Sequence, residues 1–309
     1  MRGWWVLLLM SALPAALGLP GATVSATIGV VRAQASDVRC ETTATPLTSS
    51  TPDAGAPTNV SPSSPVSIPA GGGRLTVFAA ASLTDAFNQM GKDLEAAHPG
   101  LTVEFNFAGS QALVTQLREG ATADVFASAG QEPMDVAIAA GVVEGEPIRF
   151  TQNRLVIVVP RDNPGDVQTA ADIGAPGLRL VLAAPDVPVG RYAWDALCAM
   201  GEDPVTYGAE FVGGVVANVA SEENNVKAVL AKVRLGEADA GIVYATDVTP
   251  DVAAAVTVVE IPPTVNVIAA YPVAPVRGGT PELAQAFIAY LLGPEGQATL
   301  QAFGFASIP

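Results

Sequence analysis

Residues 75–85 have the sequence LTVFAAASLTD, in which a run of β-forming residues stops and a helical pattern begins at Ser82. Similar junctions occur at Ser110, around Val189 to Tyr192 and around Asn224 to Lys227. The first N–H groups of a helix lack intrahelical partners, and that end of the helix carries partial positive charge. Several such ends directed at one point would bind an anion without any cationic side chain.

Strand and helix patterns alternate from Arg74 to the C-terminus, which is typical of parallel sheets covered by helices. The strands predicted from apolar runs are Leu75–Ala80, Leu101–Phe107, Asp124–Ser128, Arg154–Pro160, Leu178–Ala183, Phe211–Ala217, Ala240–Tyr244 and the extended segment Val265–Val276. Two helices that start with proline, Pro281–Leu292 and Pro294–Phe303, end the chain. Two such series joined by extended segments predict an α/β protein with two lobes and a ligand-binding cleft between them.

The composition is that of an acidic protein with sizeable hydrophobic cores. The chain has 309 residues, 50% of them hydrophobic, and a net charge of −15. This length is enough for about two domains. The negative charge argues against binding to nucleic acid or to anionic membranes, which need clustered lysine and arginine. It does not exclude a small anion, because surface charges are screened within roughly 10 Å.

The N-terminus has the features of an export signal. An apolar stretch runs from Trp4 to Leu19, and residues 33–35 form an A-x-A cleavage site. We therefore expect residues 1–35 to be a signal peptide and the mature protein to be periplasmic or otherwise extracytoplasmic. The alternative is an uncleaved membrane anchor, because residues 3–31 carry no charge and are long enough to span a bilayer.

Residues 36–73 have the composition of a flexible linker. From Glu41 to Gly73 the segment contains 12 serine and threonine, 6 proline and 4 glycine residues. Such a composition buries too little apolar surface to offset the entropy of ordering the chain. We expect a disordered tether, which would hold the protein near a membrane if the N-terminus stays anchored.

Two cysteines, Cys40 and Cys198, are the only ones in the chain. In an oxidising compartment they could form a disulfide, but sequence alone does not show whether their Cβ atoms come within bonding distance. Charged residues lie close to Cys40, which argues against lipid attachment there. The only histidine is His98. Two cysteines and one histidine are too few for a closed zinc site, which needs four ligands.

Seven short motifs occur in an order that resembles one known family. They are AAASLTD at 79–85, FAGS at 107–110, ADVFASA at 123–129, PVGRYA at 188–193, NVKA at 225–228, GIVYATD at 241–247 and YLLGPEGQ at 290–297. Together they resemble the periplasmic molybdate-binding proteins of ATP-driven (ABC) importers. Each motif is weak alone, and their ordered combination, from about Arg74 to Ile308, is specific.

The resemblance implies a two-lobed periplasmic-binding-protein fold of type II. In that fold two crossing segments form a hinge, and the lobes close over the ligand. The crossings are expected near Arg154 to Val156 and near Ala269 to Tyr271. Lobe I would then consist of residues 74–154 and 270–309, and lobe II of residues 155–269.

The resemblance also implies the function and the binding residues. The protein would capture molybdate, and tungstate as well, and deliver it to a membrane permease as a monomer that is not an enzyme and has no cofactor or metal site beyond this ligand. The oxyanion would be held by hydroxyl and backbone N–H groups of five residues: Ser82, Ser110, Val189, Val226 and Tyr244. Val189 departs from the family, in which alanine is common, although a backbone donor tolerates a larger side chain.

Structural roles compete with each of these assignments. Ser82 with Asp85 three residues later matches a capping box, and Ser110 is a suitable N-cap. Tyr244 could be a core aromatic residue at the end of a strand. Arg191 lies close to the third junction, but a single arginine in a loop usually faces solvent, and we do not assign it to the site.

The chemistry of such a site favours one class of ligand. Donors without acceptors suit an anion that is fully deprotonated near neutral pH, such as molybdate, tungstate or sulfate, and leave the proton of hydrogen phosphate without a partner. The alternatives are another ligand on the same fold, such as sulfate or a carboxylate, or a hydrolase. The sequence lacks the motifs expected of a serine hydrolase or a nucleotide-dependent enzyme, because it has no G-x-S-x-G elbow and no Walker or G-x-G-x-x-G loop.

Overall fold

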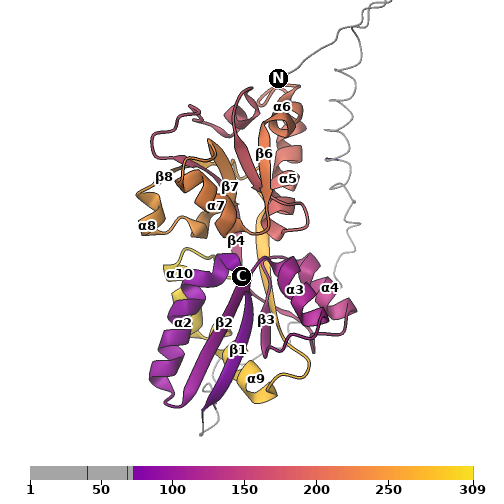
Figure 1. Cartoon of the computed structure of the whole chain (residues 1–309), viewed down its shortest axis with the longest axis vertical. Helices are drawn as coiled ribbons and strands as arrows, with labels where there is room; N and C mark the ends of the chain where they lie inside the picture. The colour runs from indigo at the N-terminus through magenta and orange to yellow at the C-terminus, as the bar shows by residue number, and fades with distance from the viewer. Residues whose placement is uncertain (1–39, 41–67, 69–71, 309) are drawn as a thin grey trace, which may run out of the picture.

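The computed structural model describes Cys40, Ile68 and residues 72–308 (Figure 1). The predicted signal peptide, residues 1–35, lies outside the described residues, and so does most of the predicted tether, residues 36–73. Within the described part of the chain, no helix is both long and apolar enough to cross a bilayer.

Nine strands and nine α-helices make up the described chain, with three short 3-10 helices between them. The strands are β1 (Gly73–Ala80), β2 (Leu101–Ala108), β3 (Val125–Ala127), β4 (Ile148–Pro160), β5 (Leu180–Ala183), β6 (Val219–Glu223), β7 (Ala240–Tyr244), β8 (Val256–Glu260) and β9 (Ile268–Pro275). The α-helices are α2 (Thr84–Ala97), α3 (Ser110–Arg118), α4 (Gln131–Ala139), α5 (Pro188–Gly201), α6 (Phe211–Asn218), α7 (Val226–Arg234), α8 (Pro250–Ala253), α9 (Pro281–Leu292) and α10 (Pro294–Ala302). The 3-10 helices are η1 (Ala81–Leu83), η2 (Ala170–Gly174) and η3 (Ala245–Asp247).

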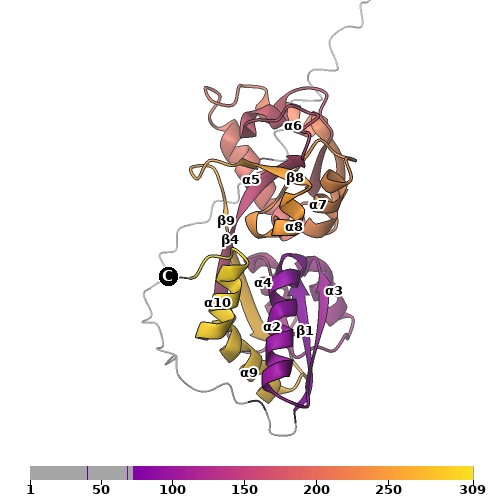
Figure 2. The same cartoon turned by 90° about the vertical axis from the view of Figure 1, so that its left-hand side faces the viewer.

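The strands follow the order β2-β1-β3-β9-β4-β7-β5-β6, and β8 pairs with β4. Figures 1 and 2 show that this order is divided between two lobes, one above the other. Lobe I contains β1, β2, β3 and β9 with α2, α3, α4, α9 and α10. Lobe II contains β5, β6, β7 and β8 with α5, α6, α7 and α8. Strand β4 belongs to both lobes.

Strand β4 changes its partners at the point where it passes from one lobe to the other. Its residues up to Arg154 pair with β9, and its residues from Leu155 pair with β7 and β8. This change falls inside the first predicted crossing. The chain passes back from lobe II to lobe I between Glu260, the end of β8, and Ile268, the start of β9, just before the second predicted crossing. The predicted residue boundaries of the lobes stay a prediction.

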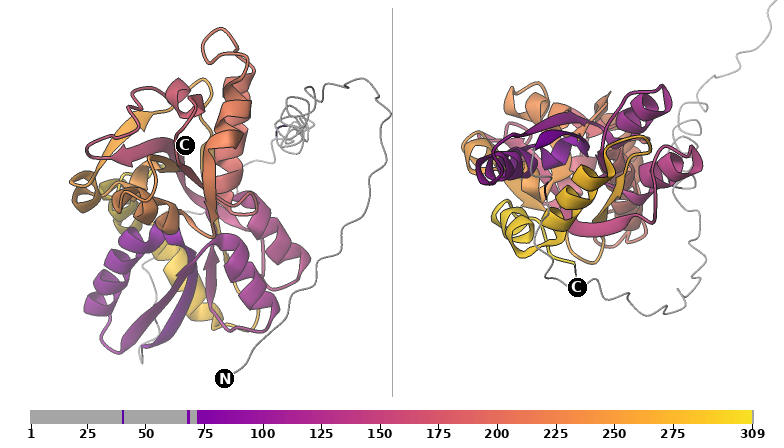
Figure 3. Two further views of the ribbon diagram at one scale, coloured as in Figure 1. Left: turned by 45° about the horizontal axis from the view of Figure 1, so that its top comes forward. Right: turned by 90° about the horizontal axis from the view of Figure 1, so that it is seen from below.

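Lobe I is assembled from both ends of the described chain because aromatic side chains from distant segments share its core. The Phe87 ring of α2 lies 5.6 Å from that of Phe287 in α9 and 6.0 Å from that of Phe150 in β4, measured between centroids. Phe87, Met90 and Leu94 are buried at helical spacing. Helix α10 packs on α2 and α9, as the view from below in Figure 3 shows.

One predicted strand is wrong. Residues 211–217 form a helix, α6, rather than a strand. The apolar run contains β-branched residues and suggested a buried strand, but the buried positions Phe211, Val215 and Asn218 recur at helical spacing. Tertiary contacts support the helix, because the Asn218 side chain donates hydrogen bonds to two carbonyl oxygens at the end of η2. The sequence pattern also did not predict β6 or β8.

A disulfide joins Cys40 to Cys198, with their Cα atoms 5.5 Å apart. The sequence had left this pairing open. Cys198 lies on α5 of lobe II, whereas β1, which follows residues 41–72 in the chain, begins in lobe I. The segment between Cys40 and β1 therefore has one end attached to each lobe.

We predict that the variant with Cys40→Ser and Cys198→Ser loses about 2–4 kcal/mol of unfolding free energy, because the cross-link restricts the unfolded chain. Urea unfolding of the oxidised wild type and of the variant measures the loss. Reductant should lower the midpoint of the wild type to that of the variant and leave the variant unchanged. Equal midpoints under oxidising conditions would contradict the prediction.

Candidate functional site

The structure brings all five predicted binding residues to one pocket between the lobes. Lobe I contributes the ends of β1 and β2 and the turn after β3, and lobe II contributes the starts of α5 and α7 and the end of β7. The lining residues are Ala80, Ala81, Ser82, Ala108, Gly109, Ser110, Ala129, Val187, Pro188, Val189, Asn225, Val226 and Tyr244. The five predicted residues are each at least 95% buried. The βα junctions singled out in the sequence therefore converge in space.

The helices of lobe II present backbone donors to this pocket. Pro188 is the first residue of α5 and has no N–H group, so Val189 supplies the first donor of that helix. At the start of α7, the side chain of Asn225 accepts the N–H of Ala228 at 3.0 Å. The N–H of Val226, the first residue of α7, has no intrahelical partner by geometry. Both valines can thus donate through the backbone.

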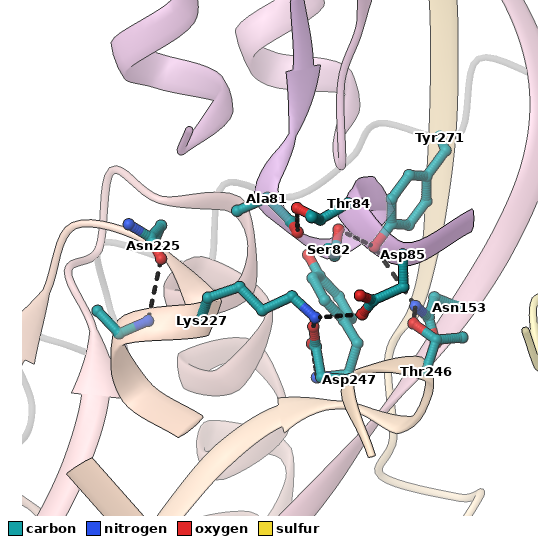
Figure 4. Close-up of polar contacts among 12 residues, drawn as sticks. Ala81, Ser82, Thr84, Asp85, Asn153, Asn225, Lys227, Thr246, Asp247 and Tyr271 are labelled. Carbon is teal, nitrogen blue, oxygen red and sulfur yellow. Dashed lines mark hydrogen bonds and ion pairs between the residues drawn. The ribbon is translucent and has the colours of Figure 1, made fainter. Parts of the chain in front are cut away.

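A chain of hydrogen bonds orients the hydroxyl of Ser82. Its Oγ lies 2.9 Å from the Tyr271 hydroxyl, and the Asn153 side-chain amide donates to that same hydroxyl at 3.4 Å (Figure 4). The Asn153 amide is fixed because its oxygen accepts the N–H of Arg154. Since Tyr271 accepts from an amide, its own proton is available to Ser82, and the Ser82 proton is left to point into the pocket.

The hydroxyls of Ser110 and Tyr244 meet at Ala129, in the turn after β3. The Ser110 Oγ accepts the Ala129 N–H at 3.0 Å and so keeps its own proton for a ligand. The Tyr244 hydroxyl donates to the Ala129 carbonyl oxygen at 3.5 Å, a long bond that a better acceptor in the pocket would replace. Both hydroxyls are therefore available as donors.

Neither serine acts as a helix cap in the structure. Leu83 is the N-cap of α2 and Gly109 is the N-cap of α3, and neither position makes a side-chain capping bond. Ser82 and Ser110 instead form the hydrogen bonds described above. The capping roles that competed with binding in the sequence are thus excluded by the geometry.

Burial keeps Tyr244, in the pocket lining, and its neighbour Tyr271 protonated. Desolvation raises the pKa of Tyr244 well above its ordinary value, and the neighbouring Tyr271 adds to this shift. Desolvation likewise raises the pKa of Tyr271, against the lowering effect of its hydrogen bond with Ser82. The two rings lie 5.8 Å apart in an edge-to-face arrangement. Tyr244 is thus both part of the core and a hydroxyl donor at the pocket wall.

None of the described residues that line the pocket carries a charge. The nearest cation in sequence, Lys227, follows the lining residue Val226, but its ammonium group is directed at Asp85 and Asp247 (Figure 4). The described chain also has no group of three or more His, Cys, Asp or Glu residues placed to hold a metal ion. The pocket can therefore bind through neutral donors and helix dipoles, and it has no side chains arranged for metal coordination or acid–base catalysis.

Two glycines of lobe I allow lobe II to approach closely. A Cβ atom on Gly109 would lie 2.5 Å from the backbone oxygen of Asn224, and one on Gly130 would lie 2.9 Å from the Tyr192 hydroxyl. Gln111 adds a hydrogen bond from its amide to the Asn224 oxygen, at 3.1 Å. The structure is therefore in a closed arrangement, with the lobes in contact around the pocket.

Sequence reasoning was wrong about Arg191, which we expected to face solvent. Its guanidinium forms an ion pair with Glu132 of α4 and lies over the ring of Tyr192. The contact crosses from lobe II to lobe I. Tyr271 and Asn153 were missed altogether, because each lies within an apolar or extended segment that carries no motif of its own.

Two lobes connected by crossing strands and closed over a pocket of neutral donors define a solute-binding protein. The comparison with known families agrees. Residues 75–306 match the family described as bacterial extracellular solute-binding protein, and the chain belongs to it.

Named relatives align with this chain over most of their own length. The chain is 42% identical over 248 residues to the molybdate-binding protein ModA of Mycobacterium tuberculosis, which covers 79% of this chain and 90% of that protein. It is 32% identical to the ModA of Escherichia coli, over 75% and 89% of the two chains. The predicted resemblance is confirmed, and so is the expectation of a binding protein rather than an enzyme, because these relatives bind a solute.

Solved structures share the fold. The periplasmic molybdate-binding protein of Azotobacter vinelandii superposes with a TM-score of 0.63 at 20% identity, over 76% of this chain and 99% of that one. The sulfate-binding protein SubI of Mycobacterium tuberculosis gives a TM-score of 0.67 at 19% identity, over 76% and 87%. The predicted two-lobed fold of type II is thereby confirmed.

We predict that Gly109→Ala weakens oxyanion binding by about tenfold, which corresponds to about 1.4 kcal/mol. The added methyl group would meet the Asn224 oxygen, which lies there only when the lobes are closed, and the flexible end of the Gln111 side chain, whose displacement would break its bond to the same oxygen. The φ of −60° at Gly109 suits alanine. Calorimetric titration with molybdate measures the affinity. Gly213→Ala is the matched control, because its Cβ would have no neighbour nearer than 3.9 Å. Native affinity in Gly109→Ala would contradict close packing of the lobes at this point.

Proposed function

We propose that this protein captures molybdate, and tungstate as well, in the pocket between its lobes and delivers the anion to the permease of an ABC importer. The observation that carries the proposal is the convergence of neutral donors from both lobes on one uncharged pocket. The relatives at 42% and 32% identity are named as molybdate-binding proteins, which supports the same ligand here.

The donor set is sufficient for tight binding of a dianion. Ser82 and Ser110 would each donate through hydroxyl and backbone, Val189 and Val226 through the backbone, and Tyr244 through its hydroxyl. Hydrogen bonds to a charged group contribute roughly 1.5–3 kcal/mol each, so about six would give on the order of 9–18 kcal/mol before the costs of ordering and desolvation. Micromolar to nanomolar affinity, roughly 8–12 kcal/mol, falls within this range.

Closure of the lobes is the step that the transporter would recognise. We assign residues 74–154 and 270–309 to lobe I and residues 155–269 to lobe II, with the partner change in β4 as the hinge. An anion held by donors of both lobes bridges them and shifts the population toward the closed form. A permease that contacts both lobes would then select the loaded protein, which we take to act as a monomer.

The N-terminal segment fits a protein that works outside the cytoplasm. We propose that residues 1–35 direct export and that residues 36–73 act as a tether, so that the folded lobes lie in the periplasm or an equivalent compartment. The disulfide between Cys40 and Cys198 is consistent with an oxidising compartment. If the export segment is retained, the tether would hold the protein at the membrane.

Sulfate is the second candidate ligand. A sulfate-binding protein of Synechococcus elongatus is 27% identical over 225 residues, and the sulfate-binding SubI shares the fold. Sulfate is also a tetrahedral dianion without a proton to place, so the same donors suit it. It differs from molybdate in size, and the fit of the closed pocket decides between them.

We predict that molybdate and tungstate raise the melting temperature of the purified protein and that phosphate does not. A ligand that binds only the folded protein at one hundred times its dissociation constant adds about 2.7 kcal/mol of stability. Calorimetric titration against molybdate, tungstate, sulfate and phosphate gives the affinities. An equal response to phosphate would contradict a site made of donors alone, and a response to sulfate only would favour the second candidate.

We predict that the double change Ser82→Ala and Ser110→Ala abolishes molybdate binding while the protein stays folded. The changes remove two hydroxyl donors and leave Tyr271 and the Ala129 N–H without their partners, which costs about 1–3 kcal/mol of stability per site. Thr151→Val is the control, because it removes a buried hydroxyl bond of lobe I outside the pocket. A folded double variant with native affinity would exclude both serines as ligands.

A further inference from the structure

One ion pair crosses from lobe I to lobe II beside the pocket without lining it. The Lys227 Nζ of α7 lies 2.9 Å from a carboxylate oxygen of Asp85 in α2. Asp85 comes three residues after Ser82, and Lys227 comes directly after Val226. The pair therefore connects the two turns that present pocket donors from opposite lobes.

Lobe II holds Lys227 in position by itself. The carboxylate of Asp247, which is fully buried in η3, lies 3.3 Å from the Lys227 Nζ, and its other oxygen accepts the N–H of Tyr244. Both contacts lie within lobe II. When the lobes separate, Lys227 keeps Asp247 as a partner and loses only Asp85.

The protonation states support a lasting charge on Lys227. Burial lowers the pKa of its ammonium group, but the carboxylates of Asp247 and Asp85 outweigh this effect and raise it. Burial raises the pKa of Asp247 to about 6, against the stabilising charge of Lys227. Near neutral pH the lysine is therefore cationic, and it offers Asp85 a charged partner whenever the lobes meet.

Partial burial gives the pair between the lobes its strength. The side chain of Lys227 is 30% exposed and that of Asp85 is 44% exposed, so water screens the contact only in part. Another charged contact across the lobes, between Arg191 and Glu132, joins a guanidinium side chain that is 26% exposed to a carboxylate side chain that is 59% exposed. The carboxylate of Asp85 is thus better shielded than that of Glu132, whereas the two cationic side chains are shielded to a similar degree.

We propose that the Asp85–Lys227 ion pair is a latch that holds the lobes closed over the bound anion and slows its release. The proposal rests on the proposed function, because it assigns a role in retaining the same ligand. Asp85 is a positioning residue in this scheme, since it acts on lobe II and does not touch the anion.

The effect of removing the Asp85 charge on affinity distinguishes a latch from simple repulsion between Asp85 and the anion. A carboxylate close to an anion site repels the anion, so its removal should tighten binding if repulsion were its only effect. A latch gives the opposite result, because loss of Asp85 destabilises the closed form and speeds release. The sign of the change in affinity therefore decides between the two.

The test compares Asp85→Asn with Asp93→Asn. Both variants remove one negative charge from α2, but Asp93 bonds to Gln89 on the same helix and does not reach lobe II. Stopped-flow release and calorimetric titration with molybdate give the rate and the affinity. We expect release from Asp85→Asn to be about three- to tenfold faster, with a matching loss of affinity, and release from Asp93→Asn to be unchanged. Unchanged or slower release from Asp85→Asn, or tighter binding, would overturn the latch.

Solution scattering without ligand distinguishes failure of the latch from failure of the proposed function. If the wild type binds no molybdate, the proposed function is wrong, but the latch can still be judged from the radius of gyration of the ligand-free proteins. A larger radius for Asp85→Asn than for the wild type and Asp93→Asn would support it. Equal radii in that case would overturn it.

Discussion

Unpaired backbone N–H groups at the starts of helices are the feature on which this structure depends. Such groups lose water when the lobes close, and a buried donor without a partner costs free energy. The closed form of the pocket is therefore favourable only when an acceptor fills it or when other contacts between the lobes offset the cost. Anion affinity and lobe closure therefore both follow from the need of these buried N–H groups for an acceptor.

Residues at the hinge also orient one of the proposed ligand donors, the hydroxyl of Ser82. Asn153 precedes the point where β4 changes its partners, and Tyr271 lies on β9, the neighbouring strand. The amide of Asn153 donates to Tyr271, which contacts Ser82, and to Thr246 of lobe II at 2.7 Å. A hinge movement that alters this amide would also alter the orientation of the Ser82 hydroxyl, so lobe closure and donor geometry are coupled through residues outside the pocket.

The sequence predicted those parts of the site that belong to local βα junctions. A strand end followed by a helix start is visible in the order of residues, which is why the junctions at Ser82, at Ser110, around Val189 to Tyr192 and around Asn224 to Lys227 could be located in advance. The individual backbone donors Val189 and Val226 were implied by the resemblance to a known family and not by this pattern. Contacts between distant segments leave no such pattern, so Tyr271 on a crossing strand was missed. The same limit explains α6, where an apolar run suited both a strand and a helix and packing against η2 decided the outcome.

An acidic chain can still present a site for a dianion because neutral residues line the pocket and the nearest lysine is paired with carboxylates. Lys227 is the cation closest to the pocket donors in sequence, and two carboxylates hold its ammonium group away from the lining. The anion would then be selected by the number and direction of neutral donors rather than by charge, which is the arrangement that discriminates against a protonated anion. A free cation at the same place would attract any anion and remove that discrimination. The carboxylates of Asp85 and Asp247 together thus serve specificity, because they pair with the cation that would otherwise compete with the dipoles.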